Sequence, residues 1–208
     1  MGNTVGSANT DFYSLVINKE VAYIIGLWCA DGYHRTSSIG LSNVDVDLIG
    51  RFRNFFLKRF PEARIKTRIY LPGGNRRQTA YHLYVNCRPL LRLFRSYKEN
   101  IASVISDKLI FPYLAGRFDG DGSVASDGYR DCRIVYGNRA EAERDLALIH
   151  HAGFERTKLY HYRAARTFCL YVSRFDTPLF LRSIKRHSVR LQKSVFVPRR
   201  DLIATNVA

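Results

Sequence analysis

The sequence predicts an α+β fold made of two similar repeats, each with the element order α-β-β-α-β-β-α. The main observation is an internal match, because YIIGLWCADGY at 23–33 pairs with YLAGRFDGDGS at 113–123 at a constant offset of 90 residues. In addition, the same succession of strand-like and helical patterns follows each of these two segments. We therefore expect one chain that folds as two pseudo-symmetric halves.

The chain of 208 residues divides accordingly. We expect a first repeat at 18–98 and a second repeat at 109–197, joined by a short linker at 99–108. A flexible N-terminal arm at 1–17 and a C-terminal tail at 198–208 flank the repeats.

The first predicted helix of each repeat carries small residues four positions apart, Gly26 with Ala30 and Gly116 with Gly120. Residues at that spacing share one face of a helix. Small side chains on a face allow two helix backbones to approach closely, although glycine inside a helix is otherwise unfavourable. The pattern predicts that the two helices pack against each other along this face.

Each of these helices is expected to end at an aspartate, Asp31 or Asp121, followed by Gly32 or Gly122 as a stop. A carboxylate at this end opposes the helix dipole, and the packed helices would bring two such carboxylates together. A divalent cation between them relieves that repulsion. Mg²⁺ suits oxygen ligands that are shared with phosphates, so the pair indicates a magnesium site.

The remaining elements of each repeat follow from periodicity and turn residues. A second helix with apolar residues at helical spacing ends at Pro61 in the first repeat and at Gly153 in the second. Two short strands and a closing helix come next. The predicted strands are 64–71, 79–86, 157–163 and 167–173, and the closing helices contain FRSYK (94–98) and LRSIK (181–185).

The formal net charge of +15 is concentrated late in each repeat. Residues 63–98 contain nine Lys and Arg and no acid, and residues 156–200 contain twelve with one acid, Asp176. This excess predicts a polyanionic partner, with nucleic acid ahead of an anionic membrane surface. No apolar run approaches the roughly 20 residues of a membrane span.

The four cysteines lie far apart and form no Cys-x-x-Cys pair, which argues against a zinc site. Their apolar neighbours favour buried, reduced thiols. We therefore expect an intracellular protein, in the cytoplasm or nucleoid or in an organelle.

The first strand of the late hairpin, RIKTRIYL, alternates in character. One face is basic and free to read a polyanion, and the other is expected to pack on helices. The first face holds Arg64, Lys66, Arg68 and Tyr70, and the second holds Ile65, Thr67, Ile69 and Leu71. The strands of the second repeat alternate less clearly, so Tyr160 and His161 are not assigned to a face.

The two motifs resemble the signature helix of LAGLIDADG homing endonucleases. YLAGRFDGDGS is the closer match, and YIIGLWCADGY has Trp28 and Cys29 where the pattern usually has Ile and Asp. The resemblance covers about residues 18–195, including the order of elements in both repeats. It is to the compact monomeric members with two motifs, and it implies a saddle of antiparallel β-sheets bound to double-stranded DNA, with the signature helices at the repeat interface and no protein partner required.

The resemblance also implies a function, which is site-specific cleavage of both DNA strands to leave short 3′ overhangs. Two hairpin sheets side by side would cover about 20 base pairs. The last acid of each motif, Asp31 and Asp121, would bind divalent metal together with the carbonyl groups of Ala30 and Gly120. Mg²⁺ is the expected ion, Mn²⁺ can substitute, and Ca²⁺ can bind without supporting cleavage. We assign no direct catalytic role to Asp119.

Other site residues follow from family position. Asn43 and Asn138 are candidates to position water, and both also suit a helix N-cap. Lys98, Lys185 and Lys193 are candidates for the basic residue near the scissile phosphate, with Lys98 and Lys193 preferred. A solvated or phosphate-anchoring role is the alternative for each lysine.

The hairpins are expected to lie in the major groove, where Arg pairs with guanine. The candidate DNA-binding residues are Arg35, Arg64, Lys66, Arg68, Tyr70, Arg76, Arg77, Arg130, Arg133, Lys158, Arg163 and Arg166. Two other functions remain open on the same scaffold, a non-catalytic DNA-binding regulator and an RNA-splicing maturase. The acids retained in both motifs favour the endonuclease.

Overall fold

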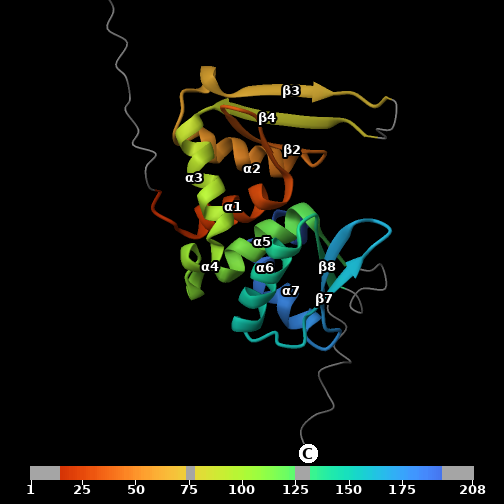
Figure 1. The fold of residues 1–208 in the computed structure, drawn as a ribbon. Coiled ribbons are helices and arrows are strands. Elements are labelled where there is room, and N and C mark those ends of the chain that lie inside the picture. The colour runs from red at the N-terminus through yellow and green to blue at the C-terminus, as the bar shows by residue number, and fades with distance from the viewer. Residues whose placement is uncertain (1–14, 74–77, 125–131, 194–208) are drawn as a thin grey trace, which may run out of the picture.

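The computed structural model describes residues 15–73, 78–124 and 132–193, and it confirms the predicted α+β fold with two repeats. Each repeat runs α-β-β-α-β-β-α in the expected order (Figure 1). The elements of the first repeat are α1 (Lys19–Asp31), β1 (Gly32–His34), β2 (Ser38–Asn43), α2 (Val46–Leu57), β3 (Lys66–Tyr70), β4 (Ala80–Asn86) and α3 (Arg88–Glu99). Those of the second are α5 (Ile110–Asp121), β5 (Gly122–Val124), β6 (Cys132–Tyr136), α6 (Arg139–His151), β7 (Lys158–Tyr162), β8 (Thr167–Val172) and α7 (Thr177–Lys185).

Helices α1 and α5 form the centre of the molecule, with one sheet on either side of the pair (Figure 1). The predicted close contact is present. A Cβ on Gly26 would lie 2.0 Å from the carbonyl oxygen of Tyr113, and one on Gly116 would lie 2.0 Å from that of Tyr23. These distances are far below van der Waals contact, so only glycine permits this approach at either position.

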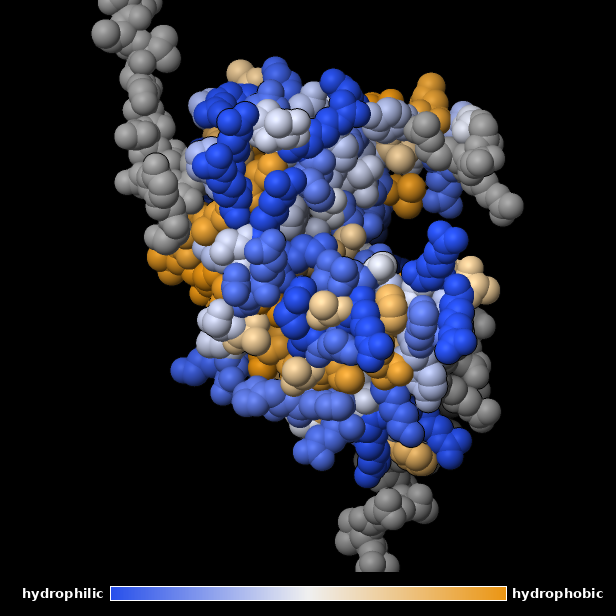
Figure 2. Space-filling model, in the orientation of Figure 1, coloured by the Kyte–Doolittle hydropathy of each residue, from blue (hydrophilic) through white to orange (hydrophobic). Residues whose placement is uncertain are grey.

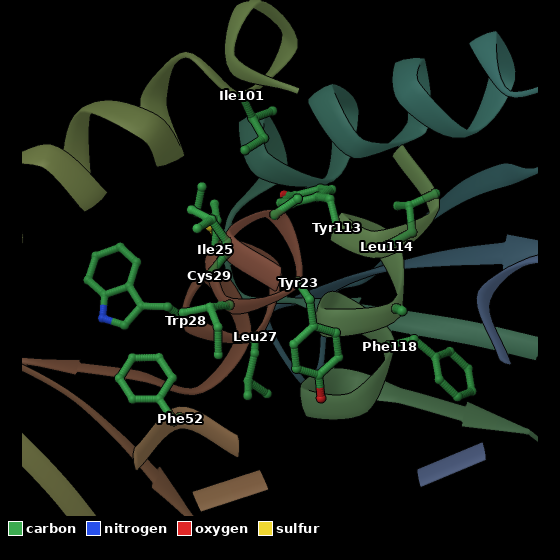
Figure 3. Packing of buried hydrophobic residues seen from close by; sticks show 14 of the residues in the cluster. Tyr23, Ile25, Leu27, Trp28, Cys29, Phe52, Ile101, Tyr113, Leu114 and Phe118 are labelled. Atoms are coloured by element: carbon green, nitrogen blue, oxygen red, sulfur yellow. The ribbon is translucent and has the colours of Figure 1, made fainter. Parts of the chain in front are cut away.

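Buried side chains fill the space around this helix pair. Figure 3 shows Tyr23, Leu27 and Trp28 of α1 among them, together with Phe118 of α5. The core continues from the helix pair into both repeats, which makes the two halves one packed unit.

Each repeat holds a four-stranded antiparallel sheet, ordered β1-β2-β4-β3 and β5-β6-β8-β7. One face of each sheet is apolar and packs on helices. In the first sheet this face includes Ile39 and Leu41 of β2 and Leu83 and Val85 of β4, all fully buried. The opposite faces of both sheets are open, and the β3–β4 and β7–β8 hairpins project on the same side of the molecule (Figure 1).

Two details of the first hairpin correct the sequence analysis. Arg64 is not in the strand, because it ends a 3-10 helix (Glu62–Arg64) and donates a hydrogen bond to the carbonyl of Asn86 at 2.9 Å. The face expected to pack on helices is also largely uncovered, since Ile69 and Leu71 are 60% and 72% exposed. β3 is the edge strand, and the hairpin extends beyond the helices that cover the rest of the sheet (Figure 1).

The segment between the repeats has secondary structure of its own. Residues 99–108 include the short helix α4 (Ile101–Val104) and the start of a 3-10 helix (Asp107–Leu109). After α7, a further short helix, α8 (Val189–Lys193), returns to the central helix pair.

Gly32 and Gly122 directly follow α1 and α5, as the predicted stop requires, but neither has the left-handed conformation that is common in glycine caps. Gly32 and Gly122 have φ of −62° and −86°, which any residue can adopt. A Cβ on Gly32 would lie 2.1 Å from the carbonyl oxygen of Trp28, so the glycine is required by space.

All four cysteines are buried and free of disulfides. Among the helices of the described ranges, none combines the length and the apolar character needed to cross a lipid bilayer.

Candidate metal centre and nucleic-acid interface

The ends of α1 and α5 bring the two motif aspartates to the middle of the molecule. Asp31 and Asp121 are each the last residue of their helix, and both are partly buried. The helices are so close here that a Cβ on Gly120 would lie 2.9 Å from Oδ2 of Asp31. The close packing of the helices therefore determines where the carboxylates lie.

Burial raises the pKa of both carboxyl groups. The pKa of Asp31 is raised to about 6 by burial and by the negative charge of Asp121. The pKa of Asp121 is raised by burial, which the cations Arg117 and Lys98 oppose. Two partly desolvated carboxyl groups, one of which raises the pKa of the other, are suited to a cation between or beside them.

Asp31 has a defined partner. Nδ2 of Asn43, at the end of β2, donates a hydrogen bond of 2.7 Å to Oδ2 of Asp31. The oxygen of the same amide accepts from the backbone N–H of Asp45 at 2.7 Å, which fixes the amide orientation. Asn43 is not the N-cap of α2, since that position is held by Asp45. A cleft of about 480 Å³ opens beside this pair, and Gly120 and Arg190 line it as well.

Asp121 lies among charged groups. Nζ of Lys98 donates to the carbonyl of Cys29 at 3.4 Å and lies 3.0 Å from Oε1 of Glu141. Asn138 is the N-cap of α6 and accepts from the N–H of Glu141 at 3.2 Å, as the capping interpretation expected. The two asparagines that are equivalent in sequence therefore have different contacts.

Arg190 was missed by the sequence analysis. Its guanidinium donates to the carbonyl oxygens of Asp119 and Gly122, both at 3.0 Å, and so contacts the last turn of α5. Lys98 makes the corresponding contact at the last turn of α1. Arg190 comes from α8, outside the repeated pattern, so the alignment of the two repeats contained no signal for it. When FRSYK (94–98) is aligned with LRSIK (181–185), the residue equivalent to Lys98 is Lys185.

Lys193 lies further out on α8. Its ammonium group pairs with Asp47 and lies 3.4 Å from Oδ1 of Asp45, both in the first repeat. This contact links the end of the described chain to α2. Arg190, in contrast, lines the same cleft as Asp31.

The Asp119 carboxylate is buried in a network of hydrogen-bond donors, and the residue also contributes to the wall of the cleft beside Asp31. Its carboxylate accepts from the hydroxyl of Tyr23 at 2.7 Å, from the hydroxyl of Ser188, and from the backbone N–H of Val189 at 2.6 Å. It therefore joins α1, α5 and the start of α8, which is a structural role.

Arg117 occupies a fully buried position in α5 and pairs with Asp145 of α6 at 3.0 Å. The hydroxyls of Tyr113 and Tyr136 donate to the same carboxylate at 2.8 and 2.9 Å. These hydrogen bonds compensate only part of the desolvation of the two charges, since burial still raises the pKa of Asp145 and Nη1 of Arg117 has no hydrogen-bond partner among the described residues. The sequence analysis did not identify this network, because Arg117 stands at an otherwise apolar motif position.

The open face of the first sheet carries basic and aromatic side chains. Lys66, Arg68 and Tyr70 of β3 share it with His82 and Tyr84 of β4, as their cross-strand pairing shows. Arg68 lies 5.4 Å from the ring centroid of Tyr84. These contacts agree with the predicted basic face, except that Arg64 lies outside the strand.

The structure shows on which face of the second sheet Tyr160 and His161 lie, which the sequence did not decide. Arg133, Tyr171 and Lys158 are cross-strand partners on the open face, and Tyr160 lies on the same side. His161 is on the other face and stacks on Phe168 with centroids 4.5 Å apart.

The remaining DNA-binding candidates are distributed as follows. Arg163 and Arg166 are exposed in the β7–β8 turn, and Arg35 is exposed after β1. Arg76, Arg77 and Arg130 lie outside the described residues. Figure 2 shows hydrophilic residues around a hollow between the two halves, on the side from which the hairpins project.

The candidate metal ligands at the ends of α1 and α5 are all oxygen atoms, from the carboxylates of Asp31 and Asp121 and from nearby backbone carbonyls. Within residues 15–73, 78–124 and 132–193, no three His, Cys, Asp or Glu side chains form a ligand cluster. The last four carbonyls of a helix have no intrahelical N–H partner, and those of Ala30 and Gly120 belong to this group. Two carboxylates with such carbonyls fit a hard cation that takes its other ligands from water or phosphate.

Comparison with known proteins supports the family resemblance. Residues 18–98 match the family model for a LAGLIDADG-like domain. No curated protein matches the chain.

Solved structures show the same fold over most of the chain. A crystal structure of I-DmoI in complex with DNA and Mn is 18% identical, with a TM-score of 0.59 over 80% of this chain and 96% of that chain. A structure of mesophilic variants of the homing endonuclease I-DmoI has a TM-score of 0.60 at 18% identity, over 85% and 97%. The homing endonuclease I-WcaI bound to its DNA recognition sequence has a TM-score of 0.60 at 13% identity, over 90% and 92%.

Proposed function

We propose that this protein, which carries a LAGLIDADG-like domain at residues 18–98 and the two-repeat fold of I-DmoI, is a metal-dependent DNA endonuclease that cuts both strands of a specific site. The observation that carries the proposal is the meeting of Asp31 and Asp121. One carboxylate comes from each repeat, at the contact between the repeats and on the axis that would relate two DNA strands.

The open sheet faces support double-stranded DNA as the substrate. Both carry Lys and Arg next to Tyr, and the whole chain has a net charge of +15. Basic groups contact phosphates and provide affinity, whereas contacts to base edges in the groove provide specificity. Two sheets that flank the helix pair would span about 20 base pairs, given a strand rise of about 3.3 Å per residue.

Asp31, Asp121 and the carbonyls of Ala30 and Gly120 would hold the metal. When bound, Mg²⁺ makes a water nucleophilic near neutral pH and stabilises charge on the departing 3′ oxygen. Mn²⁺ would substitute, and Ca²⁺ would support binding without cleavage. Structures of I-DmoI with Mn, Mg and Ca are consistent with this choice of ions.

Other residues orient the carboxylates and the phosphate. Asn43 would keep the Asp31 carboxylate aimed at the cleft through its 2.7 Å hydrogen bond. Lys98 and Arg190 lie at the ends of α1 and α5 and would place positive charge near a phosphate. Asn138 and Lys193 remain candidates with a weaker geometric argument.

The test is cleavage of a plasmid that carries the sequence flanking the gene that encodes this protein. We expect linearisation in Mg²⁺ or Mn²⁺, with short 3′ overhangs at the cut ends. Asp31→Asn and Asp121→Asn should each lower double-strand cleavage about a thousandfold or more, since a lost metal ligand removes several kcal/mol of transition-state stabilisation. Full-rate cutting by either variant would contradict the assignment of the site.

Two other outcomes would identify a different function on the same scaffold. Tight, specific DNA binding without any cut in Mg²⁺ or Mn²⁺ would indicate a regulator. Accelerated splicing of an RNA from the same locus, without DNA cleavage, would indicate a maturase.

A further inference from the structure

A cleft of about 520 Å³ lies between the end of α1, helix α3 and helix α6. Trp28, His34, Arg95, Lys98 and Arg144 contribute to its lining. It borders the candidate metal centre through Ala30, but most of its wall has no part in the chemistry proposed above.

The indole N–H of Trp28 is the unusual group in this wall. Trp28 is only 3% exposed, and its Nε1 is buried without a hydrogen-bond partner among the described residues. An indole nitrogen is a donor only, and a buried donor without a partner costs about 1–3 kcal/mol. Such a cost is expected to persist where a ligand supplies the acceptor.

Gly32 packs directly against the edge of the indole. A Cβ at this position would lie 2.8 Å from Nε1, so any other residue here would place a side chain over the nitrogen. On another side is His34, whose ring centroid is 6.0 Å from that of the indole. His34 is exposed, so its side chain is free to move when a ligand enters.

The charge of the cleft favours an anion. Among the described residues, neither Arg95 nor Arg144 forms an ion pair. Lys98 is paired with Glu141, and Glu99 is a second acid in the lining. The two arginines without an ion pair therefore line a cleft whose other charged residues, Lys98, Glu99 and Glu141, sum to −1, which leaves a net charge of +1. Guanidinium groups match the geometry of phosphate oxygens.

We infer that this cleft is a phosphate-binding subsite in which the Trp28 indole N–H and the guanidinium groups of Arg95 and Arg144 contact one phosphate. The identification of that phosphate as part of the DNA backbone rests on the proposed function, whereas the anion site itself does not. Trp28 stands where the family pattern usually has Ile, so the contact would be a property of this chain.

The chain contains a single Trp, so one resonance reports on this site. The protein labelled with ¹⁵N at the indole nitrogen is titrated in separate arms with inorganic phosphate and with a short random-sequence duplex. Chloride at matched ionic strength is the blank. We expect both phosphate sources to move the indole N–H resonance downfield, and chloride to leave it in place.

A matched pair of variants locates the site. Arg144→Gln should weaken the apparent affinity for inorganic phosphate about tenfold, whereas Arg182→Gln, at an exposed position on α7, should not change it. Equal effects of the two variants would overturn the inference. Trp28→Phe should weaken duplex binding about tenfold, and a thermal melt of the same sample checks that the variant is folded.

The arms separate the two proposals. An unmoved indole resonance while fluorescence anisotropy reports duplex binding overturns the subsite and leaves the endonuclease standing. A resonance moved by inorganic phosphate without any duplex binding supports the subsite and contradicts the proposed function. A resonance moved by neither source overturns the subsite.

Discussion

The C-terminal ends of α1 and α5 have equivalent backbones but differ in the side chains around their last residues, Asp31 and Asp121. At Asp31, a neutral amide from Asn43 donates a hydrogen bond of 2.7 Å to the carboxylate, and Arg117 and Arg190 also lower its pKa. At Asp121, the neighbours are charged, with Lys98 3.0 Å from Glu141 and with Arg117 and Lys98 lowering a carboxyl pKa that burial raises. The site is therefore symmetric in its backbone and asymmetric in its electrostatics.

The difference has a steric origin. Where the two backbones touch, at Gly26 and Gly116, any side chain would collide with a carbonyl oxygen of the other helix. Both repeats therefore need glycine at this position. Around the carboxylates, clefts on both sides leave space for different side chains. Pseudo-symmetry should consequently be strong for packing and weak for chemistry, which the following predictions test, beginning with the largest expected effect.

The largest effect is expected at the helix contact. Gly26→Ala and Gly116→Ala each place a Cβ about 2 Å from a carbonyl oxygen of the partner helix. The helices must separate, and we expect a loss of about 3 kcal/mol of unfolding free energy for either change. Urea denaturation measures the unfolding free energy of each variant. Because the packing of the two helices is pseudo-symmetric, the two variants should lose similar amounts.

Gly50 provides the control for helix propensity. It lies in α2, and a Cβ added there would have nothing within 4 Å, so Gly50→Ala should gain about 1 kcal/mol. If Gly26→Ala or Gly116→Ala also gained stability, the close approach of the two helices would be incorrect.

The two asparagines should separate activity from stability. Asn43→Ala removes the donor to Asp31 and should lower the cleavage rate about 10- to 100-fold with little change in the melting temperature. Asn138→Ala removes the N-cap of α6 and should cost about 1 kcal/mol of stability. The same loss of activity in both variants would mean that the two halves are chemically equivalent.

The cations of α8 provide a third comparison. Arg190→Met removes a guanidinium that contacts α5 and lines the Asp31 cleft, and it should slow cleavage about tenfold. Lys193→Met breaks an ion pair in which the lysine side chain is 49% exposed, and such pairs contribute at most about 1 kcal/mol. A rate that falls more for Lys193→Met than for Arg190→Met would restore Lys193 as the phosphate contact.

The contrast between packing and chemistry also explains what the sequence could predict. The matched motifs, the glycine spacing and the strand alternation predicted the order of elements and the meeting of Asp31 with Asp121, because each is a local pattern repeated at a fixed offset. Arg190 and the buried Arg117–Asp145 pair were missed because their roles depend on contacts between elements that no periodicity encodes. Ile69 was misassigned because alternation identifies two faces of a strand but does not say whether a helix reaches the edge.

The last comparison concerns protonation of the carboxylate pair in metal-free protein. Asp31 has a folded pKa of about 6, above its ordinary value of 3.8, because of burial and the charge of Asp121. The native state therefore binds more protons than the unfolded state between these values, and stability falls as pH rises through this window. Above about pH 6 the full penalty is present, and below about pH 4 it disappears.

Asp31→Asn removes this penalty while keeping an acceptor for Asn43. In the absence of divalent metal we expect the variant to be about 2 kcal/mol more stable than the parent at pH 8 and equal to it at pH 4. Urea unfolding at both pH values measures the difference. Asp121→Asn should show a gain of the same sign, since it removes the other half of the repulsion, and Mg²⁺ should stabilise the parent more than either variant. If Asp31→Asn left the stability at pH 8 unchanged, the two carboxylates would not repel each other, and the electrostatic reason for a cation at this site would be lost.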